Sequence, residues 1–428
     1  MLILWLRLPA FISLLVSSIA VGLMAGLSGV EVINTIKNGM GSTLGFVATV
    51  VGLGAMFGGI LELSGGAKSI AQHLLKSFGE KRSGMSLGLT GFLVAIPVFF
   101  DVAFIILIPV IYALQKNTGK SLLHFAIPLL SGLAVTHSFI PPTPGPIAVA
   151  EILGANLGWV MLAGIIAGIP TMLLSGVVFG KYIGNKINLV APDSDTEETQ
   201  ILNLPNFYKI LLIIALPIFL IVLNTLTSSG FIPIESVQAK DIIGLIGHPF
   251  VALIIANLIA WYVLGRGGGF TTDQLLEVSG KSLKPAGIII LLTGAGGVFK
   301  QVLVDTNAGK MMAESLVSIG MPVIIFAFLA AALVRVVQGS ATVAMITAAG
   351  LVFPFVNGVD YSGMELAAIV IAIASGASIF SHVNDSGFWL VKEYLGMTEK
   401  QTFRSWTVMT GILAFSGFLF SVLIFTLF

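Results

Sequence analysis

Long apolar segments recur along the whole chain and are separated by short polar ones. Segments of membrane-spanning length include residues 11–27, 159–179, 210–225 and 408–427. Every backbone amide at membrane depth needs an internal hydrogen-bond partner, and these segments lack the polar and apolar alternation of barrel strands. The pattern therefore predicts an all-α polytopic membrane protein with about 11–12 spans.

Composition supports this class and narrows the partners. The chain of 428 residues is 56% hydrophobic and 10% charged, with a mean hydropathy of +1.03, which excludes an ordinary soluble protein. The lipid bilayer is the first predicted partner. A net charge of +1 gives no basis for nucleic-acid binding. Because the chain has no cysteine, disulfides, iron–sulfur clusters and thiolate metal sites are excluded.

One polar sequence occurs twice along the chain. Residues 54–68 resemble residues 296–310, which lie 242 positions later. Two related halves are typical of secondary transporters, whose site lies where the repeats meet near the middle of the bilayer. The same spacing relates three further pairs: Gly145 and Gly387, Glu151 and Glu393, and Gly154 and Gly396.

Basic residues are distributed in opposite ways in the two halves. Five basic residues of the first half have no basic counterpart 242 residues later, and five of the second half have none 242 residues earlier. Since basic loops stay cytoplasmic, equivalent loops lie on opposite sides of the membrane, and the repeats are predicted to be inverted. These residues are Lys76, Lys81, Arg82, Lys116 and Lys120, and Lys281, Lys284, Lys392, Lys400 and Arg404.

A polar stretch separates the halves. Residues 187–206 have no apolar periodicity and include the acidic run at 193–198. Such a stretch is typical of a solvated linker, here on the cytoplasmic side. The first inverted repeat is therefore predicted at 1–186 and the second at 207–428.

Each half is predicted to contain a re-entrant helical hairpin. The apolar segment 87–114 is long enough to cross once, yet basic residues flank both of its ends. A single crossing would place one basic cluster outside, so a hairpin at about 86–115 is favoured, with Asp101 near its tip. The repeat predicts a second hairpin at about 322–356, with residues 338–342 at its tip.

Each half should also contain a transmembrane helix that breaks within the bilayer. Prolines at 141, 142, 144 and 146 lack amide donors and disfavour helix at the residues before them. A broken helix is therefore predicted at about 136–146, and the repeat places a second at about 381–389. The N-terminal ends of such half-helices suit the carboxylate of an anion.

Ionisable residues inside a membrane are costly and often functional. Asp101, Asp385 and His137 are predicted to take part in proton coupling, with Asp101 as the first candidate. The structural alternatives are an Asp101 bound to hairpin amides or a cation, and a histidine bonded to carbonyls of the broken helix. Arg335 either neutralises the substrate anion or pairs with a carboxylate.

The same tracts supply hydroxyl, amide and imidazole groups for a small hydroxylated carboxylate. Ser340 and Thr342 are good donors to such a ligand, although small polar residues also join membrane helices structurally. The residues predicted to bind substrate are Thr136, His137, Thr143, Gly145, Gly339, Ser340, Thr342, Ser381, His382, Asn384 and Asp385.

Enzyme chemistry is not indicated. The glycine-rich residues 265–269 lack the Lys-Ser/Thr ending of a P-loop, and neither His-Glu-x-x-His nor Gly-x-Ser-x-Gly occurs. The five histidines are not spaced as metal ligands, so no metal and no cofactor is predicted. A ring of like charges or a carbonyl filter, as in a channel, is also missing.

The polar tracts resemble those of the gluconate permease family, which are bacterial proton symporters for gluconate and related sugar acids. The resemblance implies membership of the wider ion-transporter superfamily, with inverted repeats, re-entrant hairpins, a dimerising scaffold and a transport domain that moves as an elevator. It implies a multi-pass homodimer of the bacterial cytoplasmic (inner) membrane. The matching segments run from about Leu8 onward and include Gly52-Leu-Gly-Ala-Met56, Ser64-Gly-Gly-Ala67, Phe99-Phe-Asp-Val102, Thr136-His137, Pro141-Pro-Thr-Pro-Gly-Pro146, Gly339-Ser-Ala-Thr-Val343 and Ser381-His-Val-Asn-Asp-Ser-Gly-Phe-Trp389.

The chain departs from this family pattern in two places. Gluconate carriers tend to have Glu at the position of Asp101 and His at that of Thr143. Branches for fructuronate, glycerate or similar acids carry Asp at the position of Asp101. Relatives also tend to have a further hydrophobic helix before residues 6–27, equivalent to 210–225 in the second half. The sequence is therefore interpreted as starting at an internal methionine.

These observations predict a secondary active transporter. It would take up gluconate or a related sugar acid with protons, by alternating access. A sodium-coupled carboxylate symporter or an exchanger of the same fold is the alternative, and sodium dependence of uptake separates the two.

Overall fold

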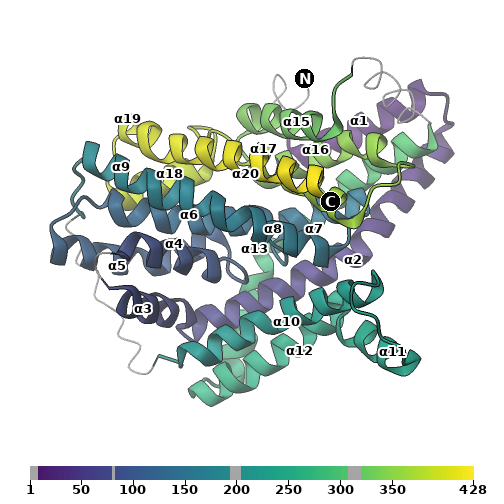
Figure 1. Cartoon of the computed structure of the whole chain (residues 1–428). Coiled ribbons are helices and arrows are strands. Elements are labelled where there is room, and N and C mark those ends of the chain that lie inside the picture. Colours follow the sequence, from purple (N-terminus) through teal and green to yellow (C-terminus); the bar gives the residue numbers. More distant parts are fainter. Residues whose placement is uncertain (1–7, 80–81, 193–203, 307–319) are drawn as a thin grey trace.

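The structure, a computed structural model, describes residues 8–79, 82–192, 204–306 and 320–428 (Figure 1). These residues are helical or irregular, without a strand among them, so the predicted all-α class is confirmed. The centre of the predicted linker (193–203) and the end of the second copy of the repeated sequence (307–310) lie outside the described residues.

The helices of the two halves follow in chain order. The first half contains α1 (Ala10–Met24), α2 (Gly29–Leu63), α3 (Gly66–Phe78), α4 (Ser83–Val94), α5 (Phe100–Thr118), α6 (Leu123–Phe139), α7 (Pro144–Leu153), α8 (Leu157–Met172), the π-helical η2 (Leu173–Val178) and α9 (Phe179–Lys186). The second half contains α10 (Phe207–Ser228), α11 (Val237–Ile246), α12 (Pro249–Ala260), η3 (Trp261–Gly265), η4 (Arg266–Gly268), α13 (Thr272–Asp305), α15 (Val323–Gln338), α16 (Ala341–Val356), α17 (Gly363–Ala377), α18 (Ser386–Leu395), α19 (Glu399–Thr402), η5 (Phe403–Thr407) and α20 (Val408–Leu427).

Many of these helices have the length and composition of membrane spans. Among the described residues, eight helical segments are long and apolar enough to cross a bilayer, and five shorter apolar helices accompany them. The shorter helices are α1, α4, α15, α16 and α17. The protein is therefore a polytopic membrane protein. Helices α4 and α5 occupy the segment in which the first hairpin is predicted, and α15 and α16 occupy that of the second.

The sequence repeat reappears in the helix boundaries. Helix α18 begins and ends 242 residues after α7, and both helices are followed by a glycine in the left-handed conformation, Gly154 (φ 72°) and Gly396 (φ 63°). The long helices α2 and α13 both begin with a capping box, in which a Ser or Thr hydroxyl and a Glu or Gln side chain bond reciprocally to the backbone. Equivalent local signals thus begin and end equivalent helices.

Helices α2 and α13 form a long central pair. With 35 and 34 residues they extend for about 50 Å, which exceeds the roughly 30 Å of a bilayer core. They approach closely at small residues: a Cβ atom on Gly39 would lie 2.8 Å from the Gly297 carbonyl oxygen. In Figure 1, α2 runs diagonally between α10–α12 and the remaining helices.

Two helix breaks separate consecutive helices, and the first lies beside α2, where Gly54 faces Pro142. The first break, residues 140–143, joins α6 to α7, and the second break, residues 378–385, joins α17 to α18. Helix α4 packs mainly on α6 and α3, whereas α15 packs on both α17 and α16. The tips between the hairpin arms, residues 95–99 and 339–340, therefore lie near the breaks.

Candidate substrate-binding site

A cavity of about 550 Å³ lies among α5, α6, α13, α15, α16, α18 and the start of α20. Helix α13 contributes an apolar wall of Pro285, Ile288, Ile289 and Leu292. Polar and charged groups from the other helices complete the lining, an arrangement typical of small-molecule sites. These groups include Asp101, His137, Ser138, Arg335, Gln338, Ser340, Thr342, Ser378, Asn384, Asp385, Ser386 and Thr410.

Three helix N-termini meet at this cavity. The first residues of α5 (100–102), α16 (341–343) and α18 (386–387) all line it. The first turn of a helix presents amide donors without partners inside that helix, and the positive end of the helix dipole adds to them. The cavity is therefore suited to a carboxylate.

Arg335 and Asp385 form an ion pair at the edge of the cavity. Arg335 Nη2 lies 2.5 Å from Asp385 Oδ2, and the side chains are only 5% and 13% exposed. Asp385 is also the N-cap of α18, where its Oδ1 accepts a hydrogen bond from the amide of Gly387 at 3.1 Å. The arginine thus pairs with a carboxylate, which is one of the two roles that the sequence leaves open.

Further polar contacts hold the second break against α15. Arg335 Nη1 donates to the Gly339 carbonyl. The carbonyl of Val336 lies 2.9 Å from His382 Nε2 and accepts from Asn384 Nδ2 at 3.0 Å. Because the last carbonyls of a helix lack partners within it, these side chains satisfy the end of α15.

Gly339 allows this close approach between the hairpin tip and the break. Its φ of +88° lies in the left-handed region, and an added Cβ would lie 2.2 Å from the Asn384 carbonyl oxygen. A residue with a side chain would be both strained and in collision at this position. The predicted role of Gly339 in the site therefore has a steric basis.

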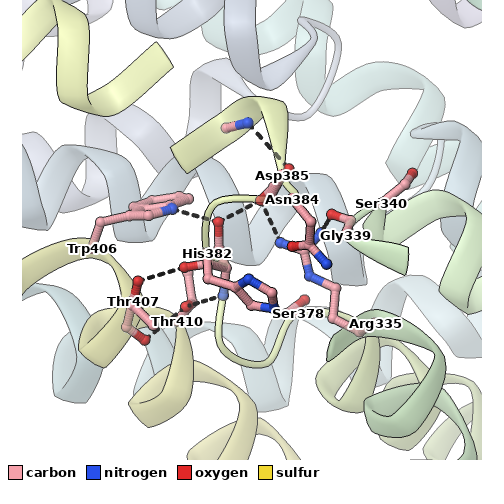
Figure 2. Close-up of polar contacts among 12 residues, drawn as sticks. Arg335, Gly339, Ser340, Ser378, His382, Asn384, Asp385, Trp406, Thr407 and Thr410 are labelled. Atoms are coloured by element: carbon pink, nitrogen blue, oxygen red, sulfur yellow. Dashed lines mark hydrogen bonds and ion pairs between the residues drawn. The ribbon is translucent and has the colours of Figure 1, made fainter. Parts of the chain in front are cut away.

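Helix η5 and the start of α20 anchor the other end of the second break. Trp406 Nε1 donates to Ser381 Oγ at 2.6 Å, and Thr407 Oγ1 donates to the Ser381 carbonyl at 2.5 Å. The Ser381 amide donates to Thr410 Oγ1 at 3.0 Å, and Ser381 Oγ also donates to Asp385. Figure 2 shows this network beside the ion pair. Ser381 is thereby a structural link between α20 and the carboxylate of Asp385.

Asp101 has a different environment from Asp385. It lies in the first turn of α5, is exposed, and lines the cavity. Within the described part of the chain, no hydrogen bond or ion pair reaches its carboxylate. Asp101 is therefore an acid of the cavity whose charge has no partnered cation.

The first break is packed against its neighbours. Thr143 is buried and its Oγ1 donates to the Ile140 carbonyl at 2.6 Å. A Cβ on Gly145 would lie 2.6 Å from Met345 Sδ, and Thr136 is fully buried. Only His137 of this tract's predicted site residues lines the cavity, with its ring edge-on to Phe99 at a centroid distance of 6.3 Å.

The structure brings part of the predicted site together. The cavity is lined by Asp101, His137, Gly339, Ser340, Thr342, Asn384 and Asp385. It is not lined by Thr136, Thr143, Gly145, Ser381 and His382, whose contact with substrate stays a prediction. Within the described residues, no group of three or more His, Asp or Glu side chains is placed to hold a metal ion.

Sequence reasoning missed several lining residues. The apolar wall from α13 has no signature in the sequence, because its residues look like those of any membrane helix. Trp406 and Thr410 lie beyond the polar tracts and enter the site through tertiary contacts. Ser138 and Ser378 carried a signal, since each adjoins a predicted break; the hydroxyl of Ser378 donates to that of Ser138 at 3.0 Å.

Solved structures with this fold are transporters. The structure of the YdaH transporter of Alcanivorax borkumensis matches with a TM-score of 0.68, over 97% of both chains and at 14% identity. That of MtrF of Neisseria gonorrhoeae, from a class of antimetabolite efflux pumps, matches with a TM-score of 0.67, over 96% of this chain and 93% of the other, also at 14% identity. At this identity the likeness concerns the fold. Together with the spans, it defines the class of fold as that of a polytopic helical membrane protein.

The family follows from the sequence as a whole. Residues 1–428 match the model of the GntP family permeases, so the chain belongs to this family. It is 43% identical to the low-affinity gluconate transporter of Escherichia coli K12, over 98% of this chain and 94% of the relative. It is 38% identical to a gluconate permease of Pseudomonas aeruginosa, over 98% of this chain and 93% of the relative. It is 36% identical to the Gnt-II system L-idonate transporter of E. coli K12, over 96% of this chain and 93% of the relative. The protein is therefore a multi-pass permease of the bacterial inner membrane and not an enzyme.

Proposed function

We propose that the protein takes up gluconate or a closely related sugar acid together with a proton, by alternating access. The observation that most supports this proposal is the cavity where three helix N-termini meet beside the unpaired Asp101. Relatives named as gluconate and L-idonate transporters support the substrate class.

The substrate carboxylate would bind at the amides that begin α16, because the Gly387 amide of α18 already donates to Asp385. Ser340, Thr342 and Asn384 line this part of the cavity and can bond to the hydroxyl groups of a sugar acid. His137, on the α6 side, would orient the chain of the substrate. The apolar wall from α13 then covers its hydrocarbon face.

Asp101 would link substrate binding to proton binding. An ionised Asp101 in the cavity repels an incoming carboxylate, and its protonation removes this repulsion. Substrate and proton therefore favour each other's binding, as linkage requires. A proton gradient would then drive uptake of the anion.

Alternating access is supported by the unequal exposure of the two half-helices. Helix α7 is buried apart from the half-buried Glu151, whereas Ser386 and Trp389 of α18 are exposed. Because Lys392 and Lys400 place the far end of α18 in the cytoplasm, we infer that the cavity opens inward here. In the opposite state α7 would become exposed outside, as an elevator movement of the transport domain would produce.

Cysteine labelling can test this movement directly, because the chain has no cysteine to remove. Ser386→Cys should react with an impermeant thiol reagent from the cytoplasmic side. Ile147→Cys, on buried α7, should react from the outside, and only in the outward-open state. If both positions react only from one side under all conditions, alternating access is wrong.

Uptake by proteoliposomes tests coupling. Labelled gluconate uptake is measured under an inward proton gradient without sodium, for wild type, Asp101→Asn and the matched control Asp241→Asn on exposed α11. We expect wild type and the control to accumulate gluconate. Asp101→Asn should lose accumulation but retain exchange of internal for external gluconate at equal pH.

Other outcomes would change the proposal. Uptake by wild type that requires sodium and ignores the proton gradient would favour the sodium-coupled alternative. Absence of gluconate uptake would exclude this substrate, and L-idonate, fructuronate and glycerate would be measured in the same assay. Accumulation by Asp101→Asn at the wild-type level would exclude Asp101 as the proton carrier.

A further inference from the structure

Among the residues that the structure describes, four ionisable side chains line the cavity, and only some of them are free to exchange a proton. They are Asp101 on α5, His137 on α6, Arg335 on α15 and Asp385 before α18. The lining of α13 is apolar, and the start of α20 contributes Trp406, Thr410 and Leu413, none of which is charged. The charge of the cavity is therefore set by these four groups.

Asp385 is fully engaged. Its Oδ2 is paired with Arg335 at 2.5 Å and accepts from Ser381, and its Oδ1 accepts from the Gly387 amide. Arg335 remains charged in proteins, and hydrogen bonds to an ionised carboxylate favour that form. The guanidinium of Arg335 thus balances the Asp385 carboxylate, and the pair adds no net charge to the cavity.

We propose that the Arg335–Asp385 ion pair fixes the coupling ratio at one proton per monocarboxylate, by keeping Asp385 out of proton exchange. This inference rests on the proposed function, in which Asp101 carries the proton. The net charge of the cavity is then the same in two states. In the empty state Asp101 is ionised, and in the loaded state Asp101 is neutral and one substrate anion is bound. Transport is then electroneutral.

Removal of Arg335 should change this ratio. Asp385 would become a second carboxylate without a cation, next to both Asp101 and the substrate anion. Like charges at short distance disfavour ionisation, so the loaded site would take up a second proton on Asp385. The carrier would then move one net positive charge with each substrate, and uptake would depend on the membrane potential.

The test is a zero-flux measurement in proteoliposomes. Preloaded vesicles are held at a fixed gluconate gradient, and the proton gradient at which net flux vanishes is determined at several potassium–valinomycin potentials. For wild type, we expect net flux to vanish when the inside-to-outside concentration ratio of gluconate equals the outside-to-inside concentration ratio of protons, at every membrane potential. For Arg335→Gln at zero membrane potential, net flux should vanish at half the pH difference that wild type needs for the same gluconate gradient. This balance point should shift with the membrane potential.

Matched variants separate charge from structure. Arg335→Gln/Asp385→Asn removes both charges and should restore the potential-independent ratio of one, even if transport is slower. Arg335→Lys keeps the charge and should also retain this ratio, although it loses the planar geometry of guanidinium. His137→Gln should leave the ratio unchanged, because the proton resides on Asp101.

Several results would overturn the inference. A potential-dependent balance point in wild type, or a ratio of one in a transporting Arg335→Gln, contradicts it. If Arg335→Gln does not fold, the double variant still decides: loss of proton coupling there would make Asp385 a coupling acid. Failure of the underlying function is distinct, because it appears as proton-driven accumulation that persists in Asp101→Asn.

Discussion

The two helix breaks have equivalent places in the repeat but are held in different ways. The first break, residues 140–143, is buried and carries prolines; it packs where Gly54 of α2 leaves room, and Gly58 leaves room for the neighbouring hairpin tip at Pro97. The second break, residues 378–385, is partly exposed and is fixed by polar contacts to Arg335, Trp406 and Thr410. Close packing therefore holds the first break in place, whereas hydrogen bonds and an ion pair hold the second.

This difference has a physical consequence. Proline restricts the backbone without any partner, so the first break needs only a close-fitting surface. The second break has no proline, and its backbone and side chains need partners to remain in one conformation. Changes of charge should therefore harm the second break most, and added volume should harm the first.

Loss of the buried cation is expected to have the largest effect. Arg335→Gln should lower the free energy of unfolding by roughly 3 kcal/mol, because it leaves the carboxylate of Asp385 without its cation. Thermal unfolding in detergent, followed by tryptophan fluorescence, measures the change. The double variant Arg335→Gln/Asp385→Asn should regain most of the loss, and a double variant as unstable as the single one would contradict the electrostatic explanation.

Added volume beneath the first hairpin tip is expected to rank second. A Cβ on Gly58 would lie 2.0 Å from the Pro97 carbonyl oxygen, so Gly58→Ala should lower stability by about 1–3 kcal/mol. Gly41→Ala is the matched control in the same helix, because nothing lies within 4 Å of its Cβ position. If both variants unfold at the same temperature, close packing of α2 on the tip does not stabilise the first break.

A single amide of the second break should contribute less. Asn384→Ala removes the bonds from Nδ2 to the carbonyls of Val336 and Val337, for an expected loss of about 1 kcal/mol. The same thermal assay measures it. Because Asn384 lines the cavity, the apparent affinity for gluconate should fall as well. A variant with wild-type stability and unchanged affinity for gluconate would show that these contacts contribute neither to stability nor to substrate binding.

The smallest effect is expected at a polar group of the first break. Thr143→Val removes the bond from Oγ1 to the Ile140 carbonyl, but that carbonyl still accepts from the Thr143 amide at 3.4 Å. Stability should change by about 0.5 kcal/mol or less, since shape holds this break. An effect larger than that of Asn384→Ala would reverse the comparison between the two breaks.

The sequence alone determined the class and the positions of the irregular backbone. Apolar segment length indicated membrane helices, because backbone amides at that depth must be satisfied within a helix. Proline chemistry located the first break, and the spacing of 242 residues transferred it to the second. These properties depend on local residues and on the repeat, so they can be read without coordinates.

Only the tertiary structure decided which polar residues share a cavity. Arg335 and Asp385 lie 50 residues apart, and their pairing depends on how α15 packs beside the second break. Thr143 and Gly145 match Asp385 and Gly387 in the repeat, yet they are buried away from the cavity that the second pair lines. The repeat makes the halves alike in sequence, but each half packs differently against α2 and α13, and that packing sets exposure.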